Sequence, residues 1–268
     1  MKTFVIAEIG SAWRFGKYQL SNGKQAIEVA KAAGADALKM QWCHFPRLME
    51  KRRKVKKHTY DLLCWDRGWM KIFAAECERF GIEFMCTVYL PEDVEVIAPF
   101  VKRFKVASLE AFDTALVQAE IDTKRQVIIS LGAQDSKDYE QFAPPTGWIW
   151  KNVKLLQCTC AYPAPPASMN LRTIGKCYDI EAGVQGLSDH SGDLLTGALA
   201  VACGAEIIEV HFRLSRTPKD NPDYGHSHSP ERLRQYINNI RRAEIMLGDG
   251  IKKVEECERP MLRHRVST

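Results

Sequence analysis

The stretch GLSDHSGDLLTGALAVACGAEIIEVHF, residues 186–212, decides the fold class of this chain of 268 residues. With the few residues before it, this stretch predicts a strand over 183–188, an amphipathic helix over 193–203 and a second strand over 206–211. Gly204 follows the helix, where glycine is well suited to end it. A strand, a helix and a strand in this order form a βαβ unit with parallel strands. The sequence therefore predicts an α/β fold.

The same alternation of strand-like and helix-like patterns runs along the rest of the chain. It predicts eight strands, over 3–8, 36–41, 83–87, 104–108, 126–130, 153–158, 183–188 and 206–211. Amphipathic helices are expected over 22–33, 67–80, 112–121, 170–177, 193–203 and 230–247. The proline-containing segment 133–150 predicts only a short or irregular turn. Eight strands with intervening helices predict a single-domain (β/α)8 TIM barrel over residues 1–250, followed by a tail over 251–268.

The composition is that of an ordinary globular protein, with 46% hydrophobic and 26% charged residues. No apolar run reaches the ~18 residues that a membrane span needs, and residues 1–10 do not resemble a secretion signal, so we expect a cytoplasmic protein. Nine cysteines occur without paired CxxC motifs, which predicts reduced thiols. The basic run KRRKVKK over 51–57 is expected to be a solvated loop. It could attract an anionic ligand, whereas the lack of interleaved aromatic residues disfavours nucleic acid.

Polar residues recur where the predicted strands end, and in a parallel barrel these ends meet at one rim. Two lysines, Lys39 and Lys105, lie within predicted strands. Strand ends also supply four hydroxyl groups, those of Thr87, Ser108, Ser130 and Ser188. Ammonium and hydroxyl groups together suit a small phosphate that carries a carboxylate. The alternative is a structural ion pair between each lysine and a carboxylate of Glu8, Glu110 or Glu209.

Two histidines close matching apolar runs, His190 after 183–188 and His211 at the end of 206–211. A single histidine on a strand is usually a core residue with its own partners. Two at equivalent ends of adjacent strands could instead hold a divalent metal, with open positions for water and substrate, an arrangement that suits catalysis. His226 and His228, in a loop further on, are given no metal role.

Nine sequence blocks, spread in order over almost the whole chain, indicate a specific family. They are AEIG with Glu8, AAGADALKMQ with Lys39, CTVY with Thr87, FKVAS before Glu110, VIISLG with Ser130, LLQCTCAYPAPP with Tyr162, GLSDHSG with His190, GAEIIEVHF with His211, and NPD with Asp223. In these blocks and their order, the chain resembles the catalytic barrel of the N-acetylneuraminate (sialic acid) synthases. Members of that family condense phosphoenolpyruvate with an aldehyde sugar.

The resemblance implies a divalent metal on His190 and His211, with Mn²⁺ expected and Mg²⁺ or Co²⁺ as alternatives. It implies that six residues surround phosphoenolpyruvate: Lys39, Thr87, Lys105, Ser108, Ser130 and Ser188. Glu8, near metal-bound water, and Glu110, near the reacting carbons, are the implied catalytic residues, and the choice of base between them stays open. Three residues are implied on the acceptor side: Gln41, Tyr162 and Asp223.

The implied reaction joins C3 of phosphoenolpyruvate to the aldehyde carbon of an aldose, such as an N-acetylmannosamine-like sugar, or of a variant acceptor. The metal would act as a Lewis acid on the aldehyde, and water would add at C2. Phosphate would then leave by C–O cleavage to give a 2-keto acid. The alternative is a non-catalytic barrel that keeps an anion and metal pocket and binds a ligand or a partner protein.

Three departures from the family pattern bear on the acceptor. The segment SAWRFG follows AEIG where the family usually has an Asn-His pair and a glycine, and Cys160 stands where an asparagine is common. No counterpart of the family's C-terminal antifreeze-like domain is seen up to Thr268. We therefore expect that another chain covers the site, in a homodimer or as a separate lid subunit, or that the acceptor differs from N-acetylmannosamine.

Overall fold

The protein is a barrel of eight parallel strands. The computed structural model describes residues 2–44, 48, 61–135, 138, 152–175 and 183–266. The strands are β1 (Phe4–Glu8), β2 (Ala37–Gln41), β3 (Glu83–Thr87), β4 (Arg103–Val106), β5 (Gln126–Ser130), β6 (Val153–Cys158), β7 (Gly186–Asp189) and β8 (Ile207–His211). Each lies within three residues of a predicted strand, so the expected (β/α)8 fold is confirmed.

The strands follow one another around the ring in the order β3-β2-β1-β8-β7-β6-β5-β4, and every described pairing is parallel. The two ends of this order, β3 and β4, lie in contact, but no hydrogen-bonded ladder joins these two described strands. The side chains of Arg103 and Glu83, the first residues of the two strands, bridge the gap with an ion pair of 2.7 Å. The barrel is thus nearly closed, with one seam.

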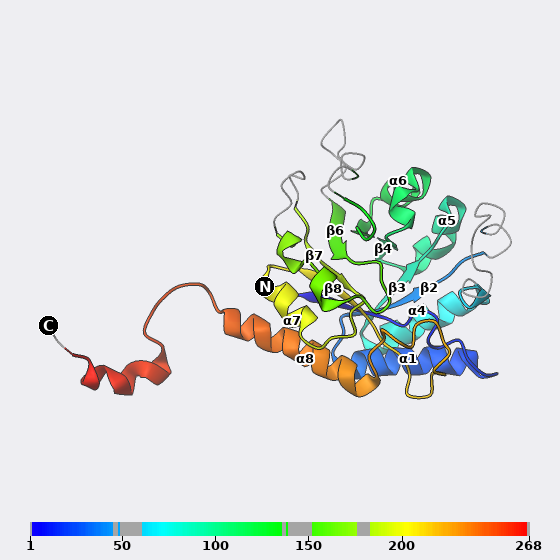
Figure 1. The fold of residues 1–268 in the computed structure, drawn as a ribbon. Coiled ribbons are helices and arrows are strands. Elements are labelled where there is room, and N and C mark those ends of the chain that lie inside the picture. The colour runs from blue at the N-terminus through cyan, green and yellow to red at the C-terminus, as the bar shows by residue number, and fades with distance from the viewer. Residues whose placement is uncertain are drawn as a thin grey trace.

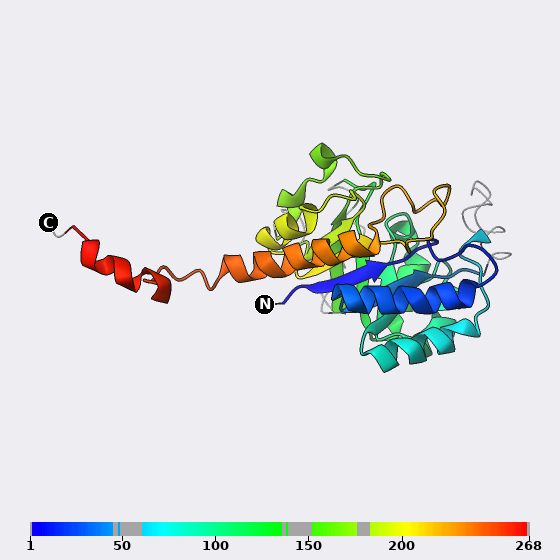
Figure 2. The same ribbon diagram turned by 90° about the horizontal axis from the view of Figure 1, so that it is seen from below.

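Helices cover the outside of the ring (Figures 1 and 2). They are α1 (Gln19–Ala33), α4 (Trp69–Phe80), α5 (Val94–Ile97), α6 (Thr114–Asp122), α7 (Thr196–Ala202) and α8 (Pro230–Leu247). Gly34 and Gly81 end α1 and α4 in the left-handed conformation, where a side chain would be strained. Neighbouring helices pack in the order α4, α1, α8, α7 along one side of the barrel.

Two expectations about the helices are wrong or incomplete. The helix expected over 170–177 is absent from its described part, where only the short 3-10 turn Leu171–Thr173 forms. Asn170 and Gly175 both have positive φ, which is incompatible with a continuous right-handed helix. After β3 the chain forms an unexpected helical connection of η1 (Pro91–Asp93), α5 and η2 (Ala98–Phe100). The basic run 51–57 and most of segment 133–150 lie outside the described residues.

Residues two apart on a strand share a side, and this period fills the barrel interior in layers. The lower layer is an apolar cluster of Ile6, Ala37, Met85, Ile128, Leu156 and Ile207. Two positions further along the same six strands stand Glu8, Lys39, Thr87, Ser130, Cys158 and Glu209. A polar layer therefore lies directly above an apolar floor, at the carboxyl ends of the strands.

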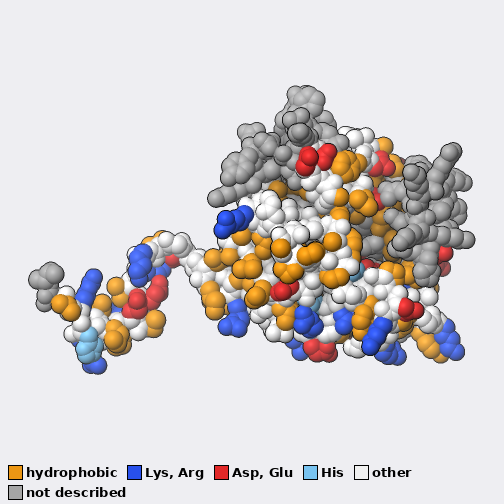
Figure 3. Space-filling model, viewed as in Figure 1, with side chains coloured by type: hydrophobic (Ala, Val, Ile, Leu, Met, Phe, Trp, Pro, Cys, Tyr) orange, Lys and Arg blue, Asp and Glu red, His pale blue; other side chains and the backbone are white. Residues whose placement is uncertain are grey.

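Beyond α8 the chain leaves the barrel (Figures 1 and 2). Residues 251–266 are exposed throughout, and they include the 3-10 helix η8 (Glu256–His264). Exposed hydrophobic side chains lie on this segment and on the last turn of α8 (Figure 3): Ile245, Met246, Leu247, Ile251, Val254, Met261 and Leu262. Within the described residues, we find no helix with the length and hydropathy of a membrane span.

Candidate active site

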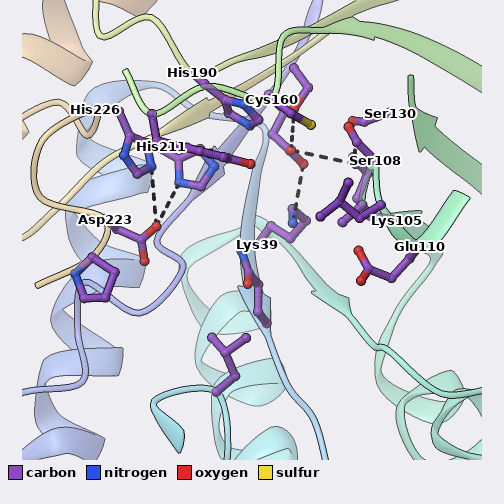
Figure 4. A pocket seen from close by; sticks show the side chains of 18 of the residues that line it. Lys39, Lys105, Ser108, Glu110, Ser130, Cys160, His190, His211, Asp223 and His226 are labelled. Atoms are coloured by element: carbon purple, nitrogen blue, oxygen red, sulfur yellow. Dashed lines mark hydrogen bonds and ion pairs between the residues drawn. The ribbon is translucent and has the colours of Figure 1, made fainter. Parts of the chain in front are cut away.

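A cavity of about 360 Å³ opens at the carboxyl ends of the strands (Figure 4). This size is in the range of small-molecule sites. Most of its lining belongs to the predicted site: Lys39, Gln41, Lys105, Ser108, Glu110, Ser130, Tyr162, Ser188, His190, His211 and Asp223. Glu8 and Thr87 do not line the cavity and lie behind Lys39, which contacts both. The structure therefore brings the predicted residues together at one rim.

Lys39 occupies the centre of a buried polar network. Its Nζ lies 2.7 Å from a carboxylate oxygen of Glu8 and 3.5 Å from one of Glu209, and it donates to Thr87 Oγ1 at 2.9 Å. The other oxygen of Glu8 accepts from Gly10 N at 2.8 Å and from Gln41 Nε2 at 2.9 Å. Glu8 thereby fixes the positions of both Lys39 and Gln41.

Lys105 lies on the opposite side of Glu209. Its Nζ donates to Ser130 Oγ and to the Val106 carbonyl oxygen, each at 2.7 Å, and lies 3.8 Å from Glu209 Oε1. That same oxygen accepts from Ser188 Oγ at 3.0 Å. Glu209 was foreseen as an ion-pair partner but not as a residue of the cavity wall. Its spacing of two residues from His211 places both on one side of β8 and could have indicated it.

Burial and neighbouring charges tune these ionisable groups. Burial opposes the charge of Glu209, but the attraction of Lys105 and Lys39 lowers its pKa to about 2. Burial likewise disfavours the charged form of Lys39, yet Glu209 and Glu8 raise its pKa above the usual value. Burial lowers the pKa of Lys105 and raises that of Glu8 to about 7. The charged residues of the cavity wall are thus backed by a carboxyl group, that of Glu8 behind Lys39, which can exchange a proton near neutral pH.

His190 is prepared to act as a ligand through one ring nitrogen. Its Nδ1 lies 3.0 Å from the Thr159 carbonyl oxygen, which can only accept, so this nitrogen carries the proton and Nε2 keeps its lone pair. Burial lowers the pKa of His190 to about 4, which keeps the ring neutral at pH 7. The ring of Tyr162 packs against it, with the centroids 4.4 Å apart.

His211 faces two neighbours, His190 and His226. The ring centroids of His211 and His190 are 5.3 Å apart, and those of His211 and His226 are 4.7 Å apart. Asp223 Oδ1 lies 3.7 Å from His211 Nδ1 and 3.4 Å from His226 Nε2 (Figure 4). Burial and the neighbouring imidazoles lower the pKa of His211 well below the usual value. The sequence had indicated His190 and His211 as a pair, but it gave His226 no role.

Cys160 adds a reactive group to the wall near Ser108. A Cβ atom placed on Gly132 would lie 2.4 Å from Cys160 Sγ, 2.8 Å from Ser108 Oγ and 3.1 Å from Cys158 Sγ, so the three side chains converge there. The hydrogen bond with Cys158, supported by Ser108, lowers the pKa of the Cys160 thiol to about 6. None of the eight described cysteines forms a disulfide bond.

Comparison with known proteins identifies the family. The NeuB family model matches residues 26–252. The chain is 30% identical to N,N'-diacetyllegionaminic acid synthase of Legionella pneumophila, over 97% of this chain and 78% of the relative. It is 28% identical to the human N-acetylneuraminate-9-phosphate synthase, over 95% of this chain and 74% of the relative.

The fold is also that of a solved synthetase structure. The N-acetylneuraminic acid (sialic acid) synthetase of Leptospira borgpetersenii superposes with a TM-score of 0.86 at 24% identity, covering 99% of this chain and 92% of that one. This likeness concerns the fold, whereas the family model and the sequence relatives concern ancestry. Because the family model covers most of the barrel, the chain belongs to the NeuB family, the sialic acid synthase family that its nine sequence blocks indicate.

Proposed function

We propose that this synthase condenses phosphoenolpyruvate with the aldehyde carbon of a sugar, with a divalent metal at the histidines, and releases inorganic phosphate. The observation that carries the proposal is one cavity with Lys39 and Lys105 on one side and His190 and His211 on the other. Ammonium groups suit the phosphate and carboxylate of one substrate, and neutral imidazoles suit a metal beside the other. Two relatives are named N,N'-diacetyllegionaminic acid synthase and N-acetylneuraminate-9-phosphate synthase, which supports a sugar acceptor.

For Lys39 and Lys105 the sequence left two alternatives, a site for an anionic ligand and a structural ion pair, and the structure is compatible with both. Each lies within 4 Å of Glu209, so structural ion pairs are present. Each also lines the cavity, so its ammonium group is within reach of a ligand. An anion that enters would meet donors already held in place, because Ser130 and Ser188 are hydrogen-bonded to Lys105 and Glu209. Such preorganised charges are the main source of electrostatic stabilisation in enzymes.

The histidine side of the cavity fits a divalent metal. Both rings are neutral at pH 7, and His211 Nδ1 is buried without a hydrogen-bond partner among the described residues. A buried nitrogen with a free lone pair is costly unless it binds something. A metal bound there, with Mn²⁺ as our first expectation, would supply Lewis-acid polarisation of the acceptor aldehyde.

The reaction that follows from this placement forms a bond between C3 of phosphoenolpyruvate and the aldehyde carbon. The cationic C2 then takes up water, whose proton passes to a carboxylate, and phosphate leaves with the electrons of the C2–O bond. Glu110 lines the cavity and Glu8 lies behind Lys39, so Glu110 is better placed to accept that proton directly. Gln41 and Tyr162 line the same cavity and would contact the acceptor. The hydroxyl group of Tyr89 donates to Gln41 Oε1 at 2.6 Å and holds that side chain in place.

The first test is phosphate release with Mn²⁺, phosphoenolpyruvate and a panel of aldehydes: N-acetylated sugars, their 6-phosphates and non-sugar aldehydes. We expect phosphate only when a suitable aldehyde is present. When the oxygen that bridges C2 and phosphorus in phosphoenolpyruvate is labelled with ¹⁸O, the label should appear in the released phosphate.

Lys105→Met should lower kcat/KM at least ~100-fold, which corresponds to about 2.7 kcal/mol of lost transition-state stabilisation. Lys154→Met is the matched control, because Lys154 is a strand lysine with an ion pair to Glu206 away from the cavity.

His211→Ala is expected to abolish the release of phosphate. Release that continues after complete removal of metal would contradict the proposal. Ligand binding without turnover across the whole panel would support the alternative of a non-catalytic binding protein.

We also propose that a second chain covers the cavity, as a homodimer or as a lid subunit. The exposed hydrophobic side chains on the last turn of α8 and on segment 251–266 offer a surface for attachment of a second chain. This surface lies at the amino ends of the strands, so the second chain would reach from there to the cavity at the opposite end. We also propose a cytoplasmic location, which the lack of disulfide bonds among the described cysteines supports.

A further inference from the structure

We propose that His226 and Asp223 are ligands of the metal, so that this chain binds it through His211, Asp223 and His226, with His190 beside them. This inference rests on the proposed function, because it concerns the same ion. It goes beyond that function by adding a third imidazole and a carboxylate to the expected pair of histidines. The ligand atoms of His211, Asp223 and His226 all lie within 4.8 Å of one another, close enough for one ion to contact all three.

The orientation of Asp223 supports its role as a ligand. Its Oδ2 accepts hydrogen bonds from Ser11 N at 2.6 Å and from Ser11 Oγ at 2.5 Å. Its Oδ1 faces His211 Nδ1 and His226 Nε2 instead. The carboxylate is therefore held by one oxygen and presents the other to the two imidazoles, as metal-bound carboxylates commonly do.

Two buried nitrogens point to a missing partner. His211 Nδ1 and His226 Nε2 are both inaccessible to water and have no hydrogen-bond partner among the described residues. Leaving two such nitrogens unsatisfied beside one carboxylate is costly in a folded protein. A cation between them would satisfy both lone pairs and the charge of Asp223.

The backbone holds His226 in place. His228 N donates to the His211 carbonyl oxygen at 3.0 Å, and Arg213 N donates to the His228 carbonyl oxygen at 2.9 Å. These bonds extend β8 by a parallel bridge between Phe212 and His228. His226 lies two residues before this bridge, so its ring is fixed against the end of the strand that carries His211. A ligand on such a support needs little reorganisation to bind.

The ligand set predicts which metals bind. Two imidazoles and one carboxylate, with a further imidazole nearby, suit borderline ions such as Co²⁺, Fe²⁺ and Zn²⁺ better than Mg²⁺, which prefers oxygen ligands. We therefore expect Co²⁺ to bind more tightly than Mn²⁺, and Mn²⁺ more tightly than Mg²⁺. Asp223 would then act on the metal rather than as the acceptor contact that the family resemblance implies.

The test is direct binding of Co²⁺ to the purified chain, by calorimetry and by the visible absorption bands of the bound ion, without any substrate. We expect His226→Ala to weaken binding at least ~10-fold and to change the absorption bands, because a nitrogen ligand is lost. His226→Gln, which keeps a polar side chain, should give the same loss. Pulsed EPR of the Mn²⁺ or Cu²⁺ form should show one fewer coupled imidazole nitrogen in both variants.

His228→Ala is the matched control, because His228 is a buried histidine of the same loop that packs on Tyr236 outside the cavity. It should leave the Co²⁺ affinity within about twofold. Removing the buried His226 ring breaks its 3.4 Å contact with Asp223 Oδ1, so we expect the metal-free His226→Ala variant to unfold at a lower temperature than the parent chain but to remain folded where Co²⁺ binding is measured.

The outcomes separate this inference from the proposed function. If His190→Ala and His211→Ala lose Co²⁺ while His226→Ala keeps the affinity and spectrum of the parent chain, the three-residue ligand set is wrong and the proposed function stands. If the parent chain binds no divalent metal at all, both fail.

Discussion

Cys160 is the residue of the cavity wall whose chemistry is most directly measurable. Its thiol, with a pKa of about 6, is mainly thiolate at neutral pH, and thiolates are the reactive form. We expect iodoacetamide to alkylate Cys160 at a rate that rises from about pH 5 to about pH 7 and then levels off. Mass spectrometry of peptides gives the modified site, and phosphoenolpyruvate should protect it because its proposed binding site shares the cavity with Cys160.

Cys203 and Cys257 serve as internal controls for this experiment, since neither lines the cavity and phosphoenolpyruvate should not protect them. A pH profile with a midpoint above pH 8 for Cys160 would contradict the lowered pKa. Protection of all three cysteines alike would show that the substrate acts elsewhere.

At the scale of single residues, the sequence predicted best where a side chain lies on a strand. Lys39, Lys105 and His211 were placed correctly at the rim because the strand register alone fixes their side of the sheet. His226 was missed because it lies in a loop, and only the three-dimensional path of that loop brings it to His211. The position of Glu8 behind the cavity wall is likewise a matter of packing that spacing does not reveal.

At the scale of elements, α6 carries a buried carboxyl group that should control stability. Neither oxygen of Glu120 has a hydrogen-bond partner among the described residues, and burial raises its pKa to about 8. The folded chain therefore binds a proton on Glu120 that the unfolded chain, with a pKa of about 4.5, releases. Between these two pKa values the free energy of unfolding should fall as pH rises, by up to about 1.4 kcal/mol per pH unit.

Glu120→Gln keeps the shape of the side chain and removes the titration. We expect the variant to equal the parent chain near pH 5 and to exceed its free energy of unfolding by a few kcal/mol near pH 8, measured with urea. Glu78→Gln, an exposed carboxyl on α4, should change little at either pH. A stability difference that does not depend on pH would show that Glu120 is ionised when folded.

The elements themselves were predictable where a repeating pattern marked them. All eight strands were predicted because their buried, mostly apolar runs are bounded by polar and turn residues. The helices α1 and α4 were predicted because each is long enough to show an amphipathic pattern. The helix expected over 170–177 failed because its apolar spacing is local, whereas the positive φ of Asn170 is set by the path of the loop. Short helical turns such as α5 carry too few residues for a periodic pattern to show.

At the scale of the molecule, the barrel should fold and bind metal without the segment that follows α8. Residues 251–266 are exposed, whereas α8 buries Leu233, Tyr236, Ile237 and Ile240 against the barrel. A chain that stops after Gly250 should keep its free energy of unfolding within about 0.5 kcal/mol, and its affinity for Co²⁺ should not change. A chain that stops after Ser229 should fail to fold. Loss of stability in the longer truncated chain would show that the terminal segment packs on the barrel in solution.

The seam between β3 and β4 gives the ring a mechanical asymmetry. A barrel is most flexible where two neighbouring strands share no hydrogen-bonded ladder. Among the described residues, the ion pair of Arg103 with Glu83 joins β3 and β4 at their amino-terminal ends. The other end of the seam carries Thr87 at the tip of β3, next to the polar floor. Thermal motion at the seam should therefore widen and narrow the mouth of the cavity while the base of the barrel stays rigid.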